Sequence, residues 1–111
     1  MKTLKFTPEL SELIVKKEKV STWRVADEKD LQSGDNVMFC VQHTGEYFGT
    51  GVLTNVTVTT FGALTPEDWM GHETFASTEE MYQTYRSYYG PELGPQTELK
   101  IITFTFTPNK E

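Results

Sequence analysis

The last regular segment of the chain, residues 99–107, alternates apolar and hydroxyl side chains with a period of two. One parity carries Ile102, Phe104 and Phe106, and the other carries Thr103, Thr105 and Thr107. Successive side chains point to opposite faces in extended backbone, so this run predicts one long β-strand. Its apolar face needs a core to cover it, which favours a fold built around a sheet.

Four further segments are rich in β-branched and aromatic residues and predict strands: 3–6, 20–25, 37–42 and 47–61. Turn signals at Ser33-Gly34-Asp35 and at His43–Glu46 separate the middle ones. Gly49 and Gly51 interrupt the longest segment, which predicts a bulge or sharp bend of the kind that barrels need at corners. Strands that are joined mostly by turns predict a largely antiparallel or mixed sheet.

Capping signals predict three helices. Thr7-Pro8 begins the first, over about residues 8–17, where apolar side chains recur at helical spacing. Thr65-Pro66 begins a short second helix, and the capping box at Ser77–Glu80 begins a third that ends at Gly90-Pro91. We therefore expect an α+β fold in which about five to six mostly antiparallel strands form a barrel with two to three helices.

The chain has 111 residues, of which 37% are hydrophobic, and this predicts one domain over residues 1–111 with its barrel core at about 4–107. A net charge of −6 argues against coating duplex DNA, but it allows a local basic pocket. Cys40 is the only cysteine, no run approaches about 18 apolar residues, and the first residues lack a signal-peptide core. We expect a cytoplasmic protein with no membrane partner; the oligomeric state stays open.

The predicted strand at 20–25 carries the first candidate site. Lys19, Thr22 and Arg24 lie within six residues, and Thr22 and Arg24 share a strand face opposite Ser21 and Trp23. A lysine, a hydroxyl and an arginine at this spacing predict a pocket for an anion or a base. A buried lysine can also act as a general base beside a hydroxyl nucleophile. From spacing alone, the alternative is a solvated strand with Lys19 and Arg24 on the outside.

The second candidate lies in the helical segment after residue 65. A carboxylate from Asp68 or Glu73 there could orient the lysine or move protons, whereas His72 alone is more typical of a surface or capping histidine. With two histidines and one cysteine we expect no metal site, and phosphate-binding and dinucleotide-binding motifs are missing, so we expect no cofactor. The tyrosines of the last helix predict core packing, with one of Tyr88 and Tyr89 free to face a cleft.

The order of these segments resembles the ASCH-domain family. The resemblance spans roughly residues 4–107. Its features are a helix before the Lys-x-x-Thr-x-Arg strand, Gly34-Asp35 before an apolar strand, the long β segment, the insert that begins at Leu64-Thr65, the Tyr-rich helix and the final strand at Ile101–Phe104. It implies a PUA-like β-barrel with a cleft between barrel and helices, lined by the Lys/Thr/Arg strand.

The family was proposed to bind RNA, and small single-domain members are similar to amidohydrolases that remove the acetyl group from 4-acetylcytidine. The resemblance then implies Lys19 as the base, Thr22 as the nucleophile and Glu73 as the group that orients Lys19. Arg24, with Trp23 and Ser21, would bind the substrate. Either His72 or Glu73 can take the family's carboxylate place, and Glu18 stands where the family usually has glycine.

Three hypotheses follow from these observations. The first is an amidohydrolase that acts on a modified nucleoside. The second is a non-enzymatic module that binds a nucleotide or short single-stranded RNA, or a single-strand ribonuclease. The third is a structural or protein-interaction domain without chemistry in the pocket, which the glutamate at position 18 allows.

Overall fold

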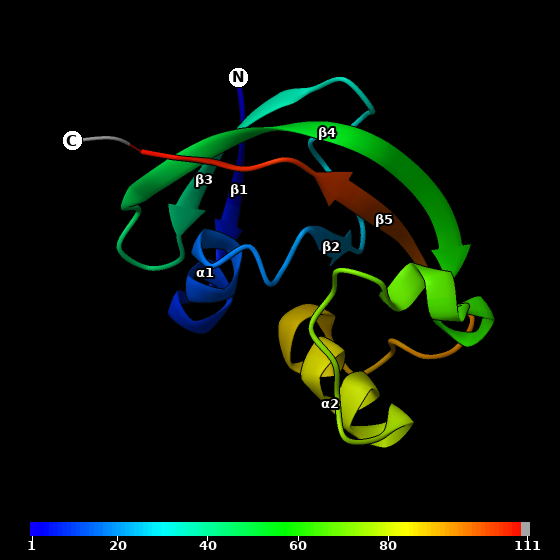
Figure 1. Cartoon of the computed structure of the whole chain (residues 1–111). Helices are drawn as coiled ribbons and strands as arrows, with labels where there is room; N and C mark the ends of the chain where they lie inside the picture. Colours follow the sequence, from blue (N-terminus) through cyan, green and yellow to red (C-terminus); the bar gives the residue numbers. More distant parts are fainter. Residues whose placement is uncertain (110–111) are drawn as a thin grey trace.

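A strongly curved sheet encloses one side of the molecule in the computed structural model, which describes residues 1–109 (Figure 1). Residues 110–111, the end of the charged tail, lie outside the described residues. The elements are β1 (Lys2–Phe6), α1 (Pro8–Val15), β2 (Ser21–Arg24), β3 (Asn36–Val41), β4 (Tyr47–Thr60), the 3₁₀ turns η1 (Phe61–Ala63) and η2 (Pro66–Trp69), α2 (Thr78–Tyr89), β5 (Glu98–Phe104) and β6 (Thr107–Pro108).

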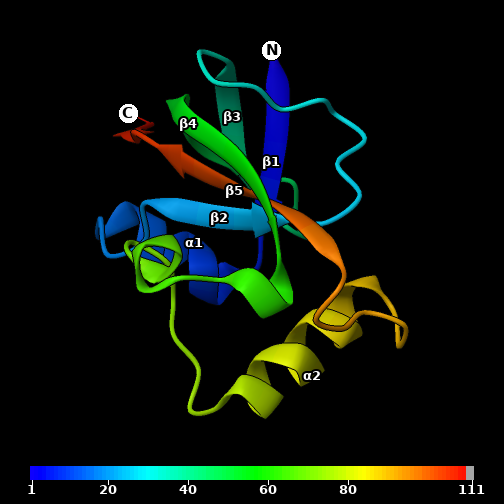
Figure 2. The same ribbon diagram turned by 90° about the vertical axis from the view of Figure 1, so that its right-hand side faces the viewer.

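The strands form one six-stranded sheet with the order β1-β3-β4-β5-β2, and β6 adds to β4. The β1–β3 pair is parallel, and every other pair is antiparallel. The long strand β4 bends across both halves of the sheet, so the sheet curls into a half-barrel, with α1 and α2 on its concave side (Figures 1 and 2). This architecture confirms the predicted α+β fold with six mostly antiparallel strands.

The C-terminal segment differs from the single long strand predicted for residues 99–107. β5 ends at Phe104, and the chain then crosses to the other half of β4, where Thr107 pairs with Thr50. The prediction was wrong for the residues after Phe104, because period-two alternation does not reveal where a strand changes its hydrogen-bonding partner. The amide of Thr105 donates to the carbonyl of Val52 at 3.0 Å as the chain crosses.

The glycines of β4 permit this crossing. A Cβ on Gly51 would overlap the carbonyl of Thr105, and one on Gly49 would overlap the Phe106 ring. β4 continues through both glycines, and its pairing shifts register opposite Phe39/Cys40 and again between Leu53 and Asn55. The predicted irregularity is therefore present on both sides of the glycine pair, where it bends the strand.

The capping predictions match the helix starts. The Thr7 hydroxyl accepts from Leu10 N at the start of α1, and the Ser77 hydroxyl accepts from Glu80 N at the start of α2. α1 ends at Val15, two residues earlier than predicted, because Lys17 adopts a left-handed φ of 64°. The predicted second helix is a 3₁₀ turn, η2. Among residues 1–109 no helix has the length and apolarity to cross a membrane.

Two apolar clusters fill the concave side. The first packs α1 on β1, β3 and the middle of the sheet, and includes Leu4, Ile14 and Phe39. The second packs α2 and the insert on β2 and the start of β5, and is centred on Trp23 and Tyr85. Because α1 and α2 sit on different clusters, they leave a cleft between them over β2.

Candidate functional site

The cleft between the two helices has a volume of about 320 Å³. β1 and the start of α1 line one side, β2 contributes Thr22 to Arg24, and the last turns of α2 line the other side. Glu73, from the segment between η2 and α2, also lines it. With Gln42, which follows β3, the cleft is thus built from five segments that are far apart in the sequence.

Lys19 points into the protein and not into solvent. Its side chain is 1% exposed, and its Nζ lies 2.5 Å from Glu73 Oε1. The insert is held against β2 because the amides of Val20 and Ser21 both donate to the carbonyl of Gly71. The alternative of a solvated strand entry with an exposed lysine is therefore wrong for Lys19. Of the two residues offered for the carboxylate place, Glu73 is the one that contacts the lysine.

Burial sets the electrostatics of this pair. Desolvation lowers the pKa of the Lys19 ammonium below its ordinary value, the carboxylate of Glu73 opposes that shift, and the positive charge of Arg24 adds to it. Burial alone would raise the pKa of Glu73, but the neighbouring Lys19 and His72 outweigh it and hold this pKa below its usual range. The pair therefore places a carboxylate against a lysine whose proton is held less tightly than in water.

His72 is enclosed behind the pair, contrary to the expectation of a surface or capping histidine. Its ring stacks on Trp23 with centroids 3.9 Å apart. Nδ1 lies 2.7 Å from the carbonyl oxygen of Glu73, which can only accept, so Nδ1 carries the proton. Nε2 then accepts from the hydroxyl of Tyr85 at 3.1 Å. Burial, helped by the charge of Lys19, lowers the pKa of His72 to about 4, so the ring is neutral at neutral pH.

Thr22 opens onto the same cleft as Glu73. The residue is 5% exposed and is one of the polar residues that line the cleft. Ser21 and Trp23, which share the opposite parity of β2, are buried. Trp23 packs in the second cluster against His72 and Tyr85, so its ring is occupied by neighbours and is not a free stacking platform. Ser21 Oγ and Trp23 Nε1 have no partner in the described part of the chain.

Arg24 extends from the other end of β2 into the cleft. Its guanidinium lies 4.8 Å from the centre of the Phe6 ring and donates to the carbonyl of Lys5 at 3.1 Å. Burial lowers the pKa of Arg24, although an arginine remains protonated. Its position beside Thr22 agrees with the strand parity that the sequence predicts.

Asp68 does not belong to this site. Its carboxylate accepts from the amide of Thr65, the capping role at the start of η2. No group of three or more metal-ligating side chains gathers anywhere in residues 1–109. The sequence analysis missed Lys5 and Gln42, which line the cleft from the β1 side. No local signal identifies them, since only the tertiary fold brings β1 beside β2.

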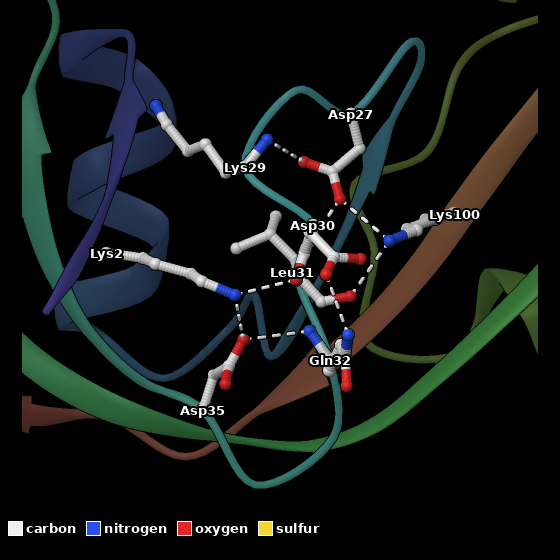
Figure 3. A network of polar contacts seen from close by, with 8 residues as sticks. All are labelled: Lys2, Asp27, Lys29, Asp30, Leu31, Gln32, Asp35 and Lys100. Carbon is white, nitrogen blue, oxygen red and sulfur yellow. Dashed lines mark hydrogen bonds and ion pairs between the residues drawn. The ribbon is translucent and has the colours of Figure 1, made fainter.

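The loop after β2 is tied down on both sides by polar contacts (Figure 3). Lys100 of β5 binds Asp27 at 2.8 Å, and Lys2 of β1 binds Asp35 at 2.8 Å and the carbonyl of Asp30 at 2.6 Å. These contacts connect the two halves of the curled sheet through the loop, because β1 is the edge strand of one half and β5 lies in the other half, beside the edge strand β2. The loop therefore forms a fixed wall beside Arg24.

The fold and site define a class of protein, the PUA-like α+β half-barrels with a cleft between sheet and helices. No family model matches the sequence, and no curated protein matches it significantly. Solved structures, in contrast, do match this chain. An ASCH domain from Lactobacillus crispatus superposes with a TM-score of 0.70 at 14% identity, over 97% of this chain and 81% of that one. The protein has the ASCH-domain fold.

Two further structures support the same assignment. The ASCH protein of Zymomonas mobilis has a TM-score of 0.65 and 18% identity, over 96% of this chain and 68% of that one. Protein EF3133 of Enterococcus faecalis, described by the family model DUF984, has a TM-score of 0.76 and 15% identity, over 97% and 77% of the two chains. At such identities these structures establish the fold alone.

Proposed function

We propose that this protein hydrolyses an exocyclic amide on a modified nucleoside, of which 4-acetylcytidine is the simplest. The observation that carries the proposal is the buried Lys19–Glu73 pair, at 2.5 Å, whose glutamate lines the same cleft as Thr22. An ion pair buried at this depth costs desolvation energy and is a weak source of stability. A buried lysine with a lowered pKa, paired with a carboxylate that lines a cleft together with a hydroxyl, is instead typical of a general base with a nucleophile.

The chemistry requires two acyl-transfer steps. Lys19 is charged in its resting ion pair with Glu73, and the base is the form that has given up its proton. In that form Nζ takes the proton of the Thr22 hydroxyl as Oγ1 attacks the amide carbonyl, and the C–N bond breaks. The leaving amine takes that proton back from Lys19. The amine of Lys19 then takes a proton from water as the water oxygen attacks the acyl-threonine carbonyl. The C–Oγ1 bond breaks, Oγ1 receives that proton from Lys19, and the carboxylic acid leaves.

Glu73 has an orienting role in this scheme. Its carboxylate fixes the Nζ position and partly offsets the loss of solvation; burial lowers the lysine pKa, and the carboxylate limits that decrease. His72 holds the backbone of Glu73 through Nδ1, and Tyr85 fixes the histidine tautomer. Because the histidine is neutral, it positions Glu73 without forming a second ion pair with the Glu73 carboxylate.

The assay is release of cytidine from 4-acetylcytidine, followed by ultraviolet absorbance with purified protein. We expect turnover by the wild type and its loss in Lys19→Met and Thr22→Val, while Thr22→Ser retains part of it. Lys16→Met is the matched control, because Lys16 is exposed on the same connection and should leave turnover unchanged. Turnover that persists in both Lys19→Met and Thr22→Val would contradict the proposal.

A second candidate function is a module that binds a nucleotide or single-stranded RNA without chemistry. Arg24 in the cleft favours it, since a guanidinium with donors to spare suits phosphate. It predicts salt-dependent binding that Arg24→Gln weakens, with no cytidine released by any variant.

A further inference from the structure

Arg24 is a cation without a counter-ion among the residues that the structure describes. Among residues 1–109 no carboxylate lies within ion-pair distance of it. Asp27 is engaged by Lys100 at 2.8 Å, and Glu73 is engaged by Lys19 at 2.5 Å. Arg24 Nε is buried without a partner in the described chain. A desolvated charge and an unmade hydrogen bond both cost free energy, so an external anion at this place would satisfy both.

A second cation lines the same cleft. Lys5, from β1, is a lining residue with an exposed side chain, and its backbone carbonyl accepts from the Arg24 guanidinium at 3.1 Å. The charged side chains of the lining are Lys5, Arg24 and Glu73, and Glu73 is already neutralised by Lys19. The cleft is therefore locally positive in a chain with a net charge of −6. A positive cleft on a protein with a negative net charge attracts an anionic ligand, while the rest of the surface repels it.

The α2 side of the cleft offers aromatic surface. Tyr88 and Tyr89 are 52% and 40% exposed, although both are large side chains that line the cleft. Their rings are 6.3 Å apart and nearly perpendicular, at 86°. Exposed aromatic faces beside a cavity suit a planar ring such as a nucleobase.

We propose that the cleft takes its ligand in the phosphorylated form, as a nucleoside monophosphate whose phosphate binds Arg24 and Lys5. This inference rests on the proposed function for the base and the reacting amide, and it adds a phosphate subsite. Thr22 and Arg24 share one face of β2, about 7 Å apart along the strand. With the reach of the arginine side chain, one nucleotide spans from Thr22 to the two cations, and its base lies beside Tyr88 and Tyr89.

The test compares cytidine 5′-monophosphate with cytidine by calorimetry or by amide chemical shifts at low salt. We expect the monophosphate to bind at least tenfold more tightly, because two charge-assisted contacts are added. Arg24→Gln and Lys5→Gln should each reduce the difference in affinity between the two ligands, and added salt should reduce it as well. Lys16→Gln, an exposed lysine outside the cleft, should leave the difference unchanged.

The outcome is separate from that of the hydrolysis assay, because binding is measured on unreactive ligands. Equal affinity for nucleoside and monophosphate, no binding of the monophosphate, or a preference that survives in Arg24→Gln/Lys5→Gln would overturn the subsite. Lys5 is exposed, so Lys5→Gln stays informative even if Arg24→Gln reduces the folded population. Tight binding of single-stranded RNA that Arg24→Gln and Lys5→Gln leave unchanged would also overturn it, since the phosphates would then bind elsewhere.

Discussion

His72 should make the protein lose stability as the pH falls below 6.5. Its pKa falls from an ordinary value of 6.5 to about 4 in the folded chain, because the ring is buried and lies near Lys19. Between these values the unfolded chain binds a proton that the folded chain does not, so the free energy of unfolding decreases as the pH falls. The full shift corresponds to about 3 kcal/mol, of which about 2 kcal/mol is lost by pH 5.

The matched comparison is His72→Asn, whose side-chain amide can still donate to the carbonyl of Glu73 but does not titrate. Urea unfolding at a series of pH values from 7.5 to 4.5, followed by tryptophan fluorescence, gives the free energy of unfolding of each protein. Trp23 and Trp69 both lie against His72, with ring centroids 3.9 Å and 5.9 Å away, so fluorescence reports the local packing. The carboxylates of the protein titrate in both variants, and the difference between the curves isolates the histidine.

We expect the two curves to converge toward low pH, because the wild type loses the histidine contribution and His72→Asn does not. His72→Asn is less stable than the wild type at pH 7.5, since the stacking on Trp23 and the bond from Tyr85 are lost. Parallel curves between pH 7.5 and 5 would refute the reasoning. They would mean that His72 reaches water or finds a counter-ion that lets it keep its proton.

Two further predictions concern the frame around the cleft. Gly51→Ala should lower the free energy of unfolding by more than about 3 kcal/mol in urea, since its Cβ would overlap the backbone of Thr105. Gly94→Ala is the control and should be nearly neutral, because the nearest atom to its Cβ is 4.0 Å away. Lys100→Met should lower the free energy of unfolding by about 2 kcal/mol, because the buried carboxylate of Asp27 loses its ion-pair partner. Amide hydrogen exchange should become faster in the loop after β2, and unchanged exchange there would show that the pair does not hold the loop.

Short sequence patterns were sufficient to predict where the helices of this fold begin and which strand residues share a face. The caps at Thr7 and Ser77 begin helices because a hydroxyl near the first amides is a property of a few consecutive residues. Strand parity placed Thr22 and Arg24 on one face for the same reason. The end of β5 could not be predicted, because the alternation continues past Phe104 while the hydrogen-bonding partner changes.

The sequence by itself determined the extended and helical segments and the strand that carries the Lys-x-x-Thr-x-Arg spacing. The tertiary structure decided that Lys19 is buried, and of the two residues that the family resemblance offered, His72 and Glu73, it pairs Lys19 with Glu73, 54 residues further along. It also decided that Arg24 faces Lys5 and lacks a carboxylate among the described residues. Side-chain burial and ion pairing depend on segments that are distant in the chain, so no short pattern contains them. The physical character of the cleft comes from how the half-barrel brings β1, β2, the insert and α2 together.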